Sequence, residues 1–121
     1  MATLTRISPV LLVADIERSV AYYRDRLGFE CEVYGDPPNF AAVMRDQATV
    51  LLALCPNPER IVPNWKIVAN MWSVDDADAL YAEVQKRGAG IDYTIYDAPH
   101  LFREFGVQDP DGNDVGFGQP I

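Results

Sequence analysis

The sequence contains few of the residues that catalytic and metal-binding sites most often use. It has one histidine, two cysteines and two tryptophans among 121 residues. Cys31 and Cys55 do not form a CxxC motif, and we interpret both as reduced core residues. The N-terminus lacks a basic stretch followed by a long apolar segment, so we expect no secretion signal, no membrane span and a cytoplasmic location.

Positive charge is also scarce, because 10 Lys and Arg stand against 18 Asp and Glu, a formal net charge of −8. Negative charge repels phosphate backbones and anionic membranes, which argues against nucleic-acid and membrane partners. It favours a cationic small molecule or peptide, although solubility alone is a sufficient reason for an acidic surface. With this length and 49% hydrophobic residues, we expect one domain over residues 1–121.

The two halves of the sequence repeat one pattern. VADIERSVAYYRDRLG and VDDADALYAEVQKRG, about sixty residues apart, each follow a strand-like segment and end at a glycine. Asp15 is expected to cap the first helix and Gly28 to end it, and the second helix is expected from Asp76 to Arg87. The predicted strands are residues 3–13, 29–34, 40–45, 49–55, 66–74, 91–95, 102–107 and 113–117.

This repeat predicts an α+β fold of two βαβββ modules. The first module covers about residues 1–55, a connector follows at 56–65, and the second module covers 66–121. Each module has one helix to cover one face of its strands. We therefore expect the modules to form a curved mixed sheet, with the helices outside and a concave cleft inside that a ligand or a partner chain can fill.

Several segments resemble the glyoxalase/bleomycin-resistance/dioxygenase superfamily, whose fold is also called vicinal oxygen chelate. PVLLVADIERSVAYYRDRLGF is similar to its opening strand and helix, and REFGVQDPDGNDVGF to its closing hairpin. The bleomycin-binding resistance proteins are most similar, through FAAV at 40–43, IVP at 61–63, LYAEV at 80–84 and REF at 103–105. The resemblance implies a homodimer, in which a proline at the place of Pro9 lets the N-terminal strand reach the neighbouring subunit. A bend within a monomer would explain Pro9 equally well.

The resemblance also allows the expected metal positions to be checked. Enzymes of this superfamily hold a divalent metal with His and Glu side chains, at places that align near Ser8, 51–53, Ala69 and Gly116. No residue there can ligate a metal, and residues 7–13, 49–54 and 67–74 contain no His, Asp or Glu. We therefore predict no metal, no cofactor and no catalytic residue.

The candidate ligand-binding residues combine aromatic rings with polar groups, as a site for flat or cationic molecules requires. They are Tyr34, Asp36, Phe40, Ala53, Asn64, Trp65, His100 and Phe102. Phe40 matches a phenylalanine of the bleomycin binders, but it is equally typical of a strand core. Trp65 suits either a stacking platform or a staple for the connector, and His100 suits either a ligand contact or a solvated loop.

Two departures from the bleomycin binders weaken the case for bleomycin itself. Asn64 stands where relatives carry an acid, and Leu101 stands where they have a stacking tryptophan. The leading hypothesis is resistance by sequestration, in which the protein binds a toxic aromatic or cationic drug without changing it. The alternatives are a metal-dependent lyase or dioxygenase of the same fold, and an accessory domain that binds a metabolite or a partner protein.

Overall fold

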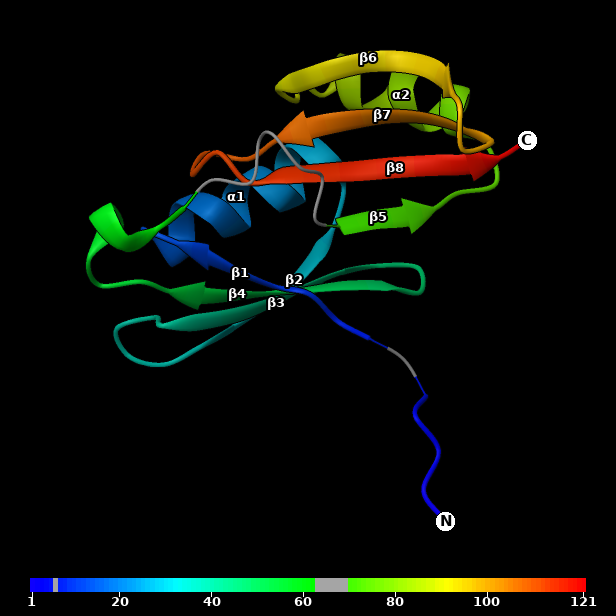
Figure 1. The fold of residues 1–121 in the computed structure, drawn as a ribbon. Helices are drawn as coiled ribbons and strands as arrows, with labels where there is room; N and C mark the ends of the chain where they lie inside the picture. Colours follow the sequence, from blue (N-terminus) through cyan, green and yellow to red (C-terminus); the bar gives the residue numbers. More distant parts are fainter. Residues whose placement is uncertain (6, 63–69) are drawn as a thin grey trace.

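The computed structural model describes residues 1–5, 7–62 and 70–121, and in them the order strand, helix, three strands occurs twice (Figure 1). The first module consists of β1 Val10–Val13, α1 Ile16–Leu27, β2 Glu30–Tyr34, β3 Phe40–Arg45 and β4 Ala48–Leu54. A short 3-10 helix, Pro58–Arg60, follows it. The second module consists of β5 Asn70–Ser73, α2 Ala77–Lys86, β6 Ile91–Ala98, β7 Phe102–Gln108 and β8 Asp114–Pro120.

Each module forms its own four-stranded sheet, and the two sheets have equivalent strand orders. The order is β1-β4-β3-β2 in the first sheet and β5-β8-β7-β6 in the second. In both, the first strand runs parallel to the last, while the other pairs are antiparallel. The predicted α+β fold of two βαβββ modules is therefore confirmed.

The helices begin and end at the predicted residues because their capping signals are local. The Asp15 side chain accepts a hydrogen bond from the Arg18 backbone N–H at 3.1 Å, and Gly28 ends α1 in the left-handed conformation at φ 76°. Asp76 caps α2 in the same way, through the Ala79 N–H at 3.0 Å. Within the described residues, no helix is long and apolar enough to cross a membrane.

Two strand boundaries differ from the prediction. β1 begins at Val10 rather than at residue 3, because Pro9 has no N–H to donate to a strand ladder. The pairing with β4 starts where the Pro9 carbonyl accepts a hydrogen bond from the Leu51 N–H at 2.9 Å. β6 continues to Ala98, beyond the predicted end of this strand at residue 95. Irregular register between Ile91 and Tyr96 lets this strand bend and still pair with β7 as far as Ala98.

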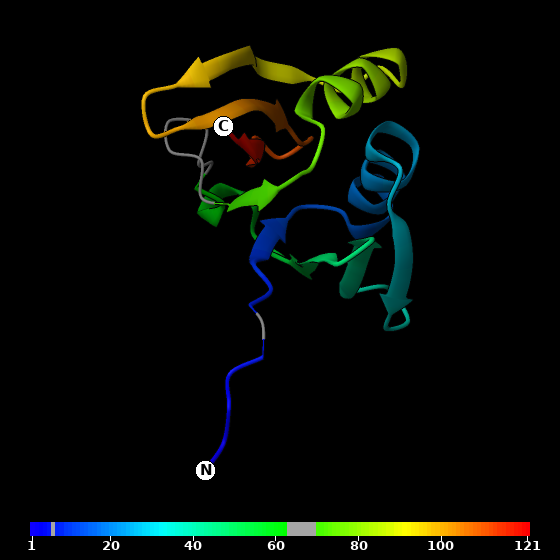
Figure 2. The same ribbon diagram turned by 90° about the vertical axis from the view of Figure 1, so that its right-hand side faces the viewer.

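The two modules meet through their helix-covered faces. In Figure 2, one sheet runs across the lower part of the molecule, the other rises at the left, and both helices lie in the angle between them. Side chains from both modules accordingly share one hydrophobic core, including Val13, Leu27, Val43, Phe105 and Phe117. In a single chain the helices therefore do not lie outside as expected, because the two apolar helix-covered faces bury each other.

Polar contacts between α1 and the β7–β8 turn hold this arrangement. The hydroxyl of Tyr23, a fully buried residue, donates to the Asp109 carboxylate at 3.3 Å. Asp111 accepts from the Ala14 backbone N–H at 3.1 Å and from the Arg18 guanidinium at 3.0 Å. The DPDGN turn noted in the sequence therefore joins the modules, as well as connecting two strands.

Candidate functional site

The face of the first sheet opposite α1 is not covered by a helix. We call it the first helix-free face. Strand alternation and register place on it Val10, Leu12, Glu30, Glu32, Tyr34, Phe40, Ala42, Met44, Thr49, Leu51 and Ala53. Val10, Leu12 and Tyr34 are exposed large apolar or aromatic residues. An exposed apolar patch of this kind indicates a binding or association surface.

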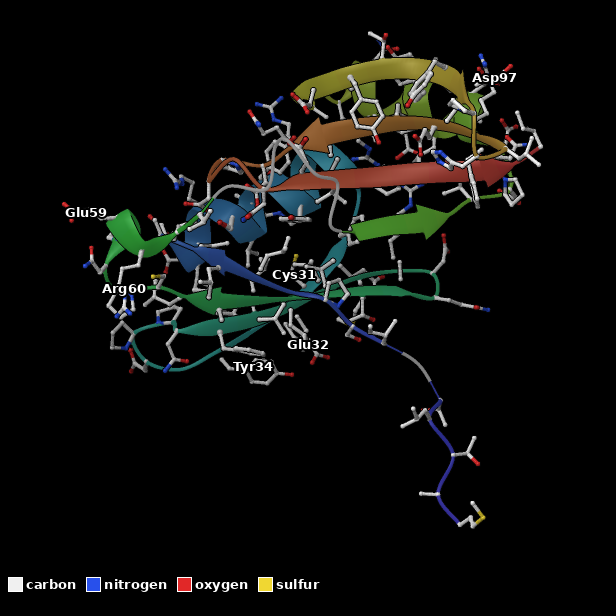
Figure 3. The ribbon with its side chains drawn as sticks, in the orientation of Figure 1. Cys31, Glu32, Tyr34, Glu59, Arg60 and Asp97 are labelled. Carbon is white, nitrogen blue, oxygen red and sulfur yellow. The ribbon has the colours of Figure 1, made fainter. Side chains whose placement is uncertain are left out.

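An aromatic pair lies at one end of the first helix-free face. Tyr34 pairs with Phe40 across the β2–β3 ladder, and their ring centroids are 6.3 Å apart. The Tyr34 hydroxyl donates to the Glu32 carboxylate, and both side chains point away from the second module in Figure 3. Ala53 is paired with Phe40 on the other side. The small side chain of Ala53 and the half-buried ring of Phe40 are therefore neighbours on this face.

The second sheet also has a face opposite its helix, the second helix-free face. Its residues are Tyr93, Tyr96, Phe102, Glu104, Gly106, Gln108, Asp114, Gly116 and Gly118. The irregular register of β6 brings both Tyr93 and Tyr96 onto this face, and their rings meet edge to face at 6.1 Å. The Tyr93 ring lies over Gly106, where a Cβ would come within 2.2 Å of a ring carbon. Glycine at 106 is therefore required by the position of this ring.

A buried carboxylate stands beside these rings. Glu104 is only 4% exposed, and its two oxygens have different partners. The Tyr96 hydroxyl donates to Oε1 at 3.2 Å, and His100 Nε2 lies 3.3 Å from Oε2. The centroids of the His100 and Phe102 rings are 5.6 Å apart, and the His100 side chain is 55% exposed. An acid flanked by aromatic rings can attract a cation and orient it by stacking.

Asp114 is a second buried carboxyl group, at the other end of the second helix-free face. Burial, together with the Asp92 carboxyl through a hydrogen bond and its charge, raises the pKa of Asp114 from 3.8 to about 7. A hydrogen bond from Gln108 Nε2 at 3.2 Å opposes this rise. Burial also raises the pKa of Tyr93, and the Glu104 charge adds to the effect. The face thus has a proton that can be lost near neutral pH.

The structure divides the predicted ligand-binding residues between the two sheets. Tyr34, Phe40 and Ala53 lie together on the first helix-free face. His100 and Phe102 lie together at the second sheet. Asp36 is exposed in the turn between β2 and β3. Asn64 and Trp65 lie outside the described residues, so their predicted roles stay predictions.

Within the described part of the chain, no three His, Cys, Asp or Glu side chains are arranged to hold a metal ion. Of the positions that align with enzyme metal ligands, Leu51, Ala53 and Gly116 lie on the helix-free faces.

The sequence-family comparison agrees with this fold. The family model for the Glyoxalase/Bleomycin resistance protein/Dioxygenase superfamily matches residues 4–117. The chain belongs to this superfamily. No curated protein matches it.

Solved structures similar to this superfamily member include both binding proteins and an enzyme. The bleomycin-binding protein of bleomycin-producing Streptomyces verticillus, complexed with copper(II)-bleomycin, is 26% identical with a TM-score of 0.79, and all of both chains is covered. TnmS3, an antibiotic-binding protein from Streptomyces sp. CB03234, is 24% identical with a TM-score of 0.75, again over all of both chains. A glyoxalase-related enzyme from Clostridium phytofermentans is 21% identical with a TM-score of 0.80, over 99% of this chain and 98% of the other.

Sequence reasoning missed two buried carboxyl groups of this superfamily member. Glu104 and Asp114 were noted only as parts of the segments REF and REFGVQDPDGNDVGF. Alternation along β7 would have placed Glu104 on the same face as Phe102, which was the one available signal. The bulge that turns Tyr93 onto that face has no equivalent signal in the sequence.

Proposed function

We propose that this protein binds a small aromatic or cationic drug without changing it, and that it confers antibiotic resistance by sequestration. The observation that carries the proposal is the pairing of aromatic rings with carboxylates on both helix-free faces. Tyr34 and Phe40 accompany Glu32 on the first face, and Tyr93 and Tyr96 accompany Glu104 on the second. Stacking surfaces and fixed negative charge together suit a flat cation.

We also propose that the binding protein is a homodimer. The helices fill the angle between the sheets, so the two helix-free faces of one chain point outward in different directions (Figure 2). A ligand held between two such faces then needs the first face of one copy and the second face of another. The exposed apolar side chains of Val10 and Leu12 support burial against a second chain, because such patches are unfavourable in water.

The copper(II)-bleomycin complex of the Streptomyces verticillus protein supports the choice of ligand class. Both cysteines of the present chain are free thiols in the structure, which fits the proposed action in a reducing cytoplasm. No metal or cofactor has a role in this proposal. The mechanism is complexation, so protection should require at least one protein chain for each drug molecule.

The proposal is tested by titrating the protein with copper(II)-bleomycin and with planar cationic antibiotics in a calorimeter. Replacing Phe40 by Leu removes the ring but keeps an apolar side chain, and we expect affinity for a bound drug to fall by about 2- to 12-fold. The matched control is Val33→Ala, which removes apolar atoms from the other side of neighbouring β2. Equal losses in both variants would mean that Phe40 does not contact the drug.

The enzyme alternative predicts a different result. A lyase or dioxygenase of this fold would convert many substrate molecules per chain and would need a divalent ion. Chromatography of the drug after incubation with a small amount of protein distinguishes the two functions, because sequestration returns all of the drug intact. An accessory domain would instead bind none of the drugs and would co-purify with a defined partner chain.

A further inference from the structure

A cavity of about 710 Å³ lies on the helix-covered side of the molecule, away from both helix-free faces. It is bordered by the β3–β4 turn, the segment before α2, and α2 itself. Its apolar lining comes from both modules, with Leu27 and Phe29 on one side and Val74, Leu80 and Phe117 on the other. Its volume lies within the range of small-molecule sites, which is about 300–1,000 Å³.

Some charged groups of this cavity are already paired with each other and are not free to bind a ligand. Arg45 is the one basic residue among the described residues that line it. Its guanidinium donates to both oxygens of Glu83, at 2.7 and 2.9 Å, and to the Leu27 carbonyl at 2.9 Å. These bonds, with a further one from Arg87, lower the pKa of the Glu83 carboxyl, so the pair stays ionised. An entering anion would therefore have to displace Glu83 from Arg45.

The remaining charges around the cavity are negative. Asp46 lies in the β3–β4 turn, and Asp75 and Asp76 lie just before α2, so acids stand on both sides of the opening. All three are exposed at the rim, while Leu27, Phe29 and Phe117 are buried below them. A ligand that fits this arrangement has an apolar body and a positive group at one end.

We propose that the cavity is a second ligand site, which takes a compact organic cation with an apolar or aromatic body. The apolar body packs against Leu27, Phe29 and Leu80, and the cationic group lies among the rim carboxylates. The site does not depend on the proposed drug-binding function, since none of its lining residues is on a helix-free face. Because its walls belong to both modules, a bound cation also stabilises the contact between them.

The test uses three probes that differ mainly in charge: phenethylammonium, 2-phenylethanol and phenylacetate. Each is titrated into the uniformly ¹⁵N-labelled full chain, and amide chemical shifts are followed. We expect phenethylammonium to shift amides near residues 45–48 and 74–80, with an affinity about fivefold or more above that of 2-phenylethanol. Phenylacetate should bind least.

Charge-removing variants test the role of the rim. The double variant Asp46→Asn with Asp75→Asn should lower the affinity for phenethylammonium toward that of 2-phenylethanol and leave the alcohol unaffected. The matched control, Glu17→Gln with Glu59→Gln, removes the same charge from exposed positions that do not line the cavity. Equal loss in both variants would show that only net charge matters, and would overturn the site.

Two further outcomes would also overturn the proposal. One is that none of the probes shifts the amides around the cavity. The other is that phenethylammonium shifts only amides of the helix-free faces. Neither outcome bears on sequestration, because that function is measured separately with antibiotics at the helix-free faces.

Discussion

Replacing Asp114 by Asn tests whether the second helix-free face holds a buried proton. The native carboxyl has a pKa of about 7, raised by burial and by Asp92, against 3.8 for an unperturbed group. Because the folded state keeps this proton more tightly than the unfolded state, the group stabilises the fold at low pH. That stability is fully present below about pH 4 and is lost as the pH rises through about 7.

The asparagine amide is neutral at every pH, so the variant does not lose this stability. Each unit of difference between the folded-state pKa of about 7 and the ordinary value of 3.8 corresponds to about 1.4 kcal/mol of stability. The protonated carboxyl therefore contributes a few kcal/mol at most. We expect the free energy of unfolding of Asp114→Asn, relative to the parent, to rise by about 1–3 kcal/mol between about pH 4.5 and pH 8. Urea denaturation at several pH values measures the difference, and acids that do not interact with residue 114 cancel because both proteins contain them.

A second variant checks the cause of the shift. Gln108 lowers the pKa of Asp114 through its hydrogen bond. Gln108→Leu should therefore move the pH at which stability is lost upward. If the difference between parent and Asp114→Asn is the same at every pH, the carboxyl does not hold a proton in the folded state, and the reasoning is refuted.

Three further substitutions test the core and the aromatic surface. Tyr23→Phe should lower the free energy of unfolding by about 1–2 kcal/mol, because Asp109 loses a buried donor between the modules; no change in the urea midpoint would contradict this. Phe105→Ala should cost about 3–5 kcal/mol, since the ring is fully buried, and a loss below about 1 kcal/mol would place it outside the core. Gly106→Ala should displace the Tyr93 ring and change its near-ultraviolet circular dichroism, whereas an unaltered spectrum would mean that the ring does not lie over the glycine.

The repeated module could be predicted because its signals are local in sequence. Asp15 and Gly28 define a helix through hydrogen bonds and a backbone conformation that involve only neighbouring residues. The bend in β6 depends on its pairing with β7 and was not visible in the sequence. Likewise, periodicity shows which side of a helix is apolar, but not that the helix-covered faces of the two modules pack against each other.

The candidate site was likewise predictable only in part. Alternation and resemblance together found Tyr34 and Phe40, which the structure places side by side. Glu104 and Asp114 were missed because what distinguishes them is that they are buried. The residues that bury them are distant along the chain or are brought near by the β6 bulge. The sequence therefore predicted the aromatic part of the site better than its electrostatic part.

Binding without chemical change is tested most directly by measuring the amount of drug that one chain binds and returns. The protein is mixed with copper(II)-bleomycin and with a panel of planar cationic antibiotics, once at equimolar ratio and once with drug in large excess. We predict that at least one drug saturates at one molecule per chain and is recovered intact under both conditions. Consumption of the excess drug, or the absence of binding by every member of the panel, would contradict sequestration.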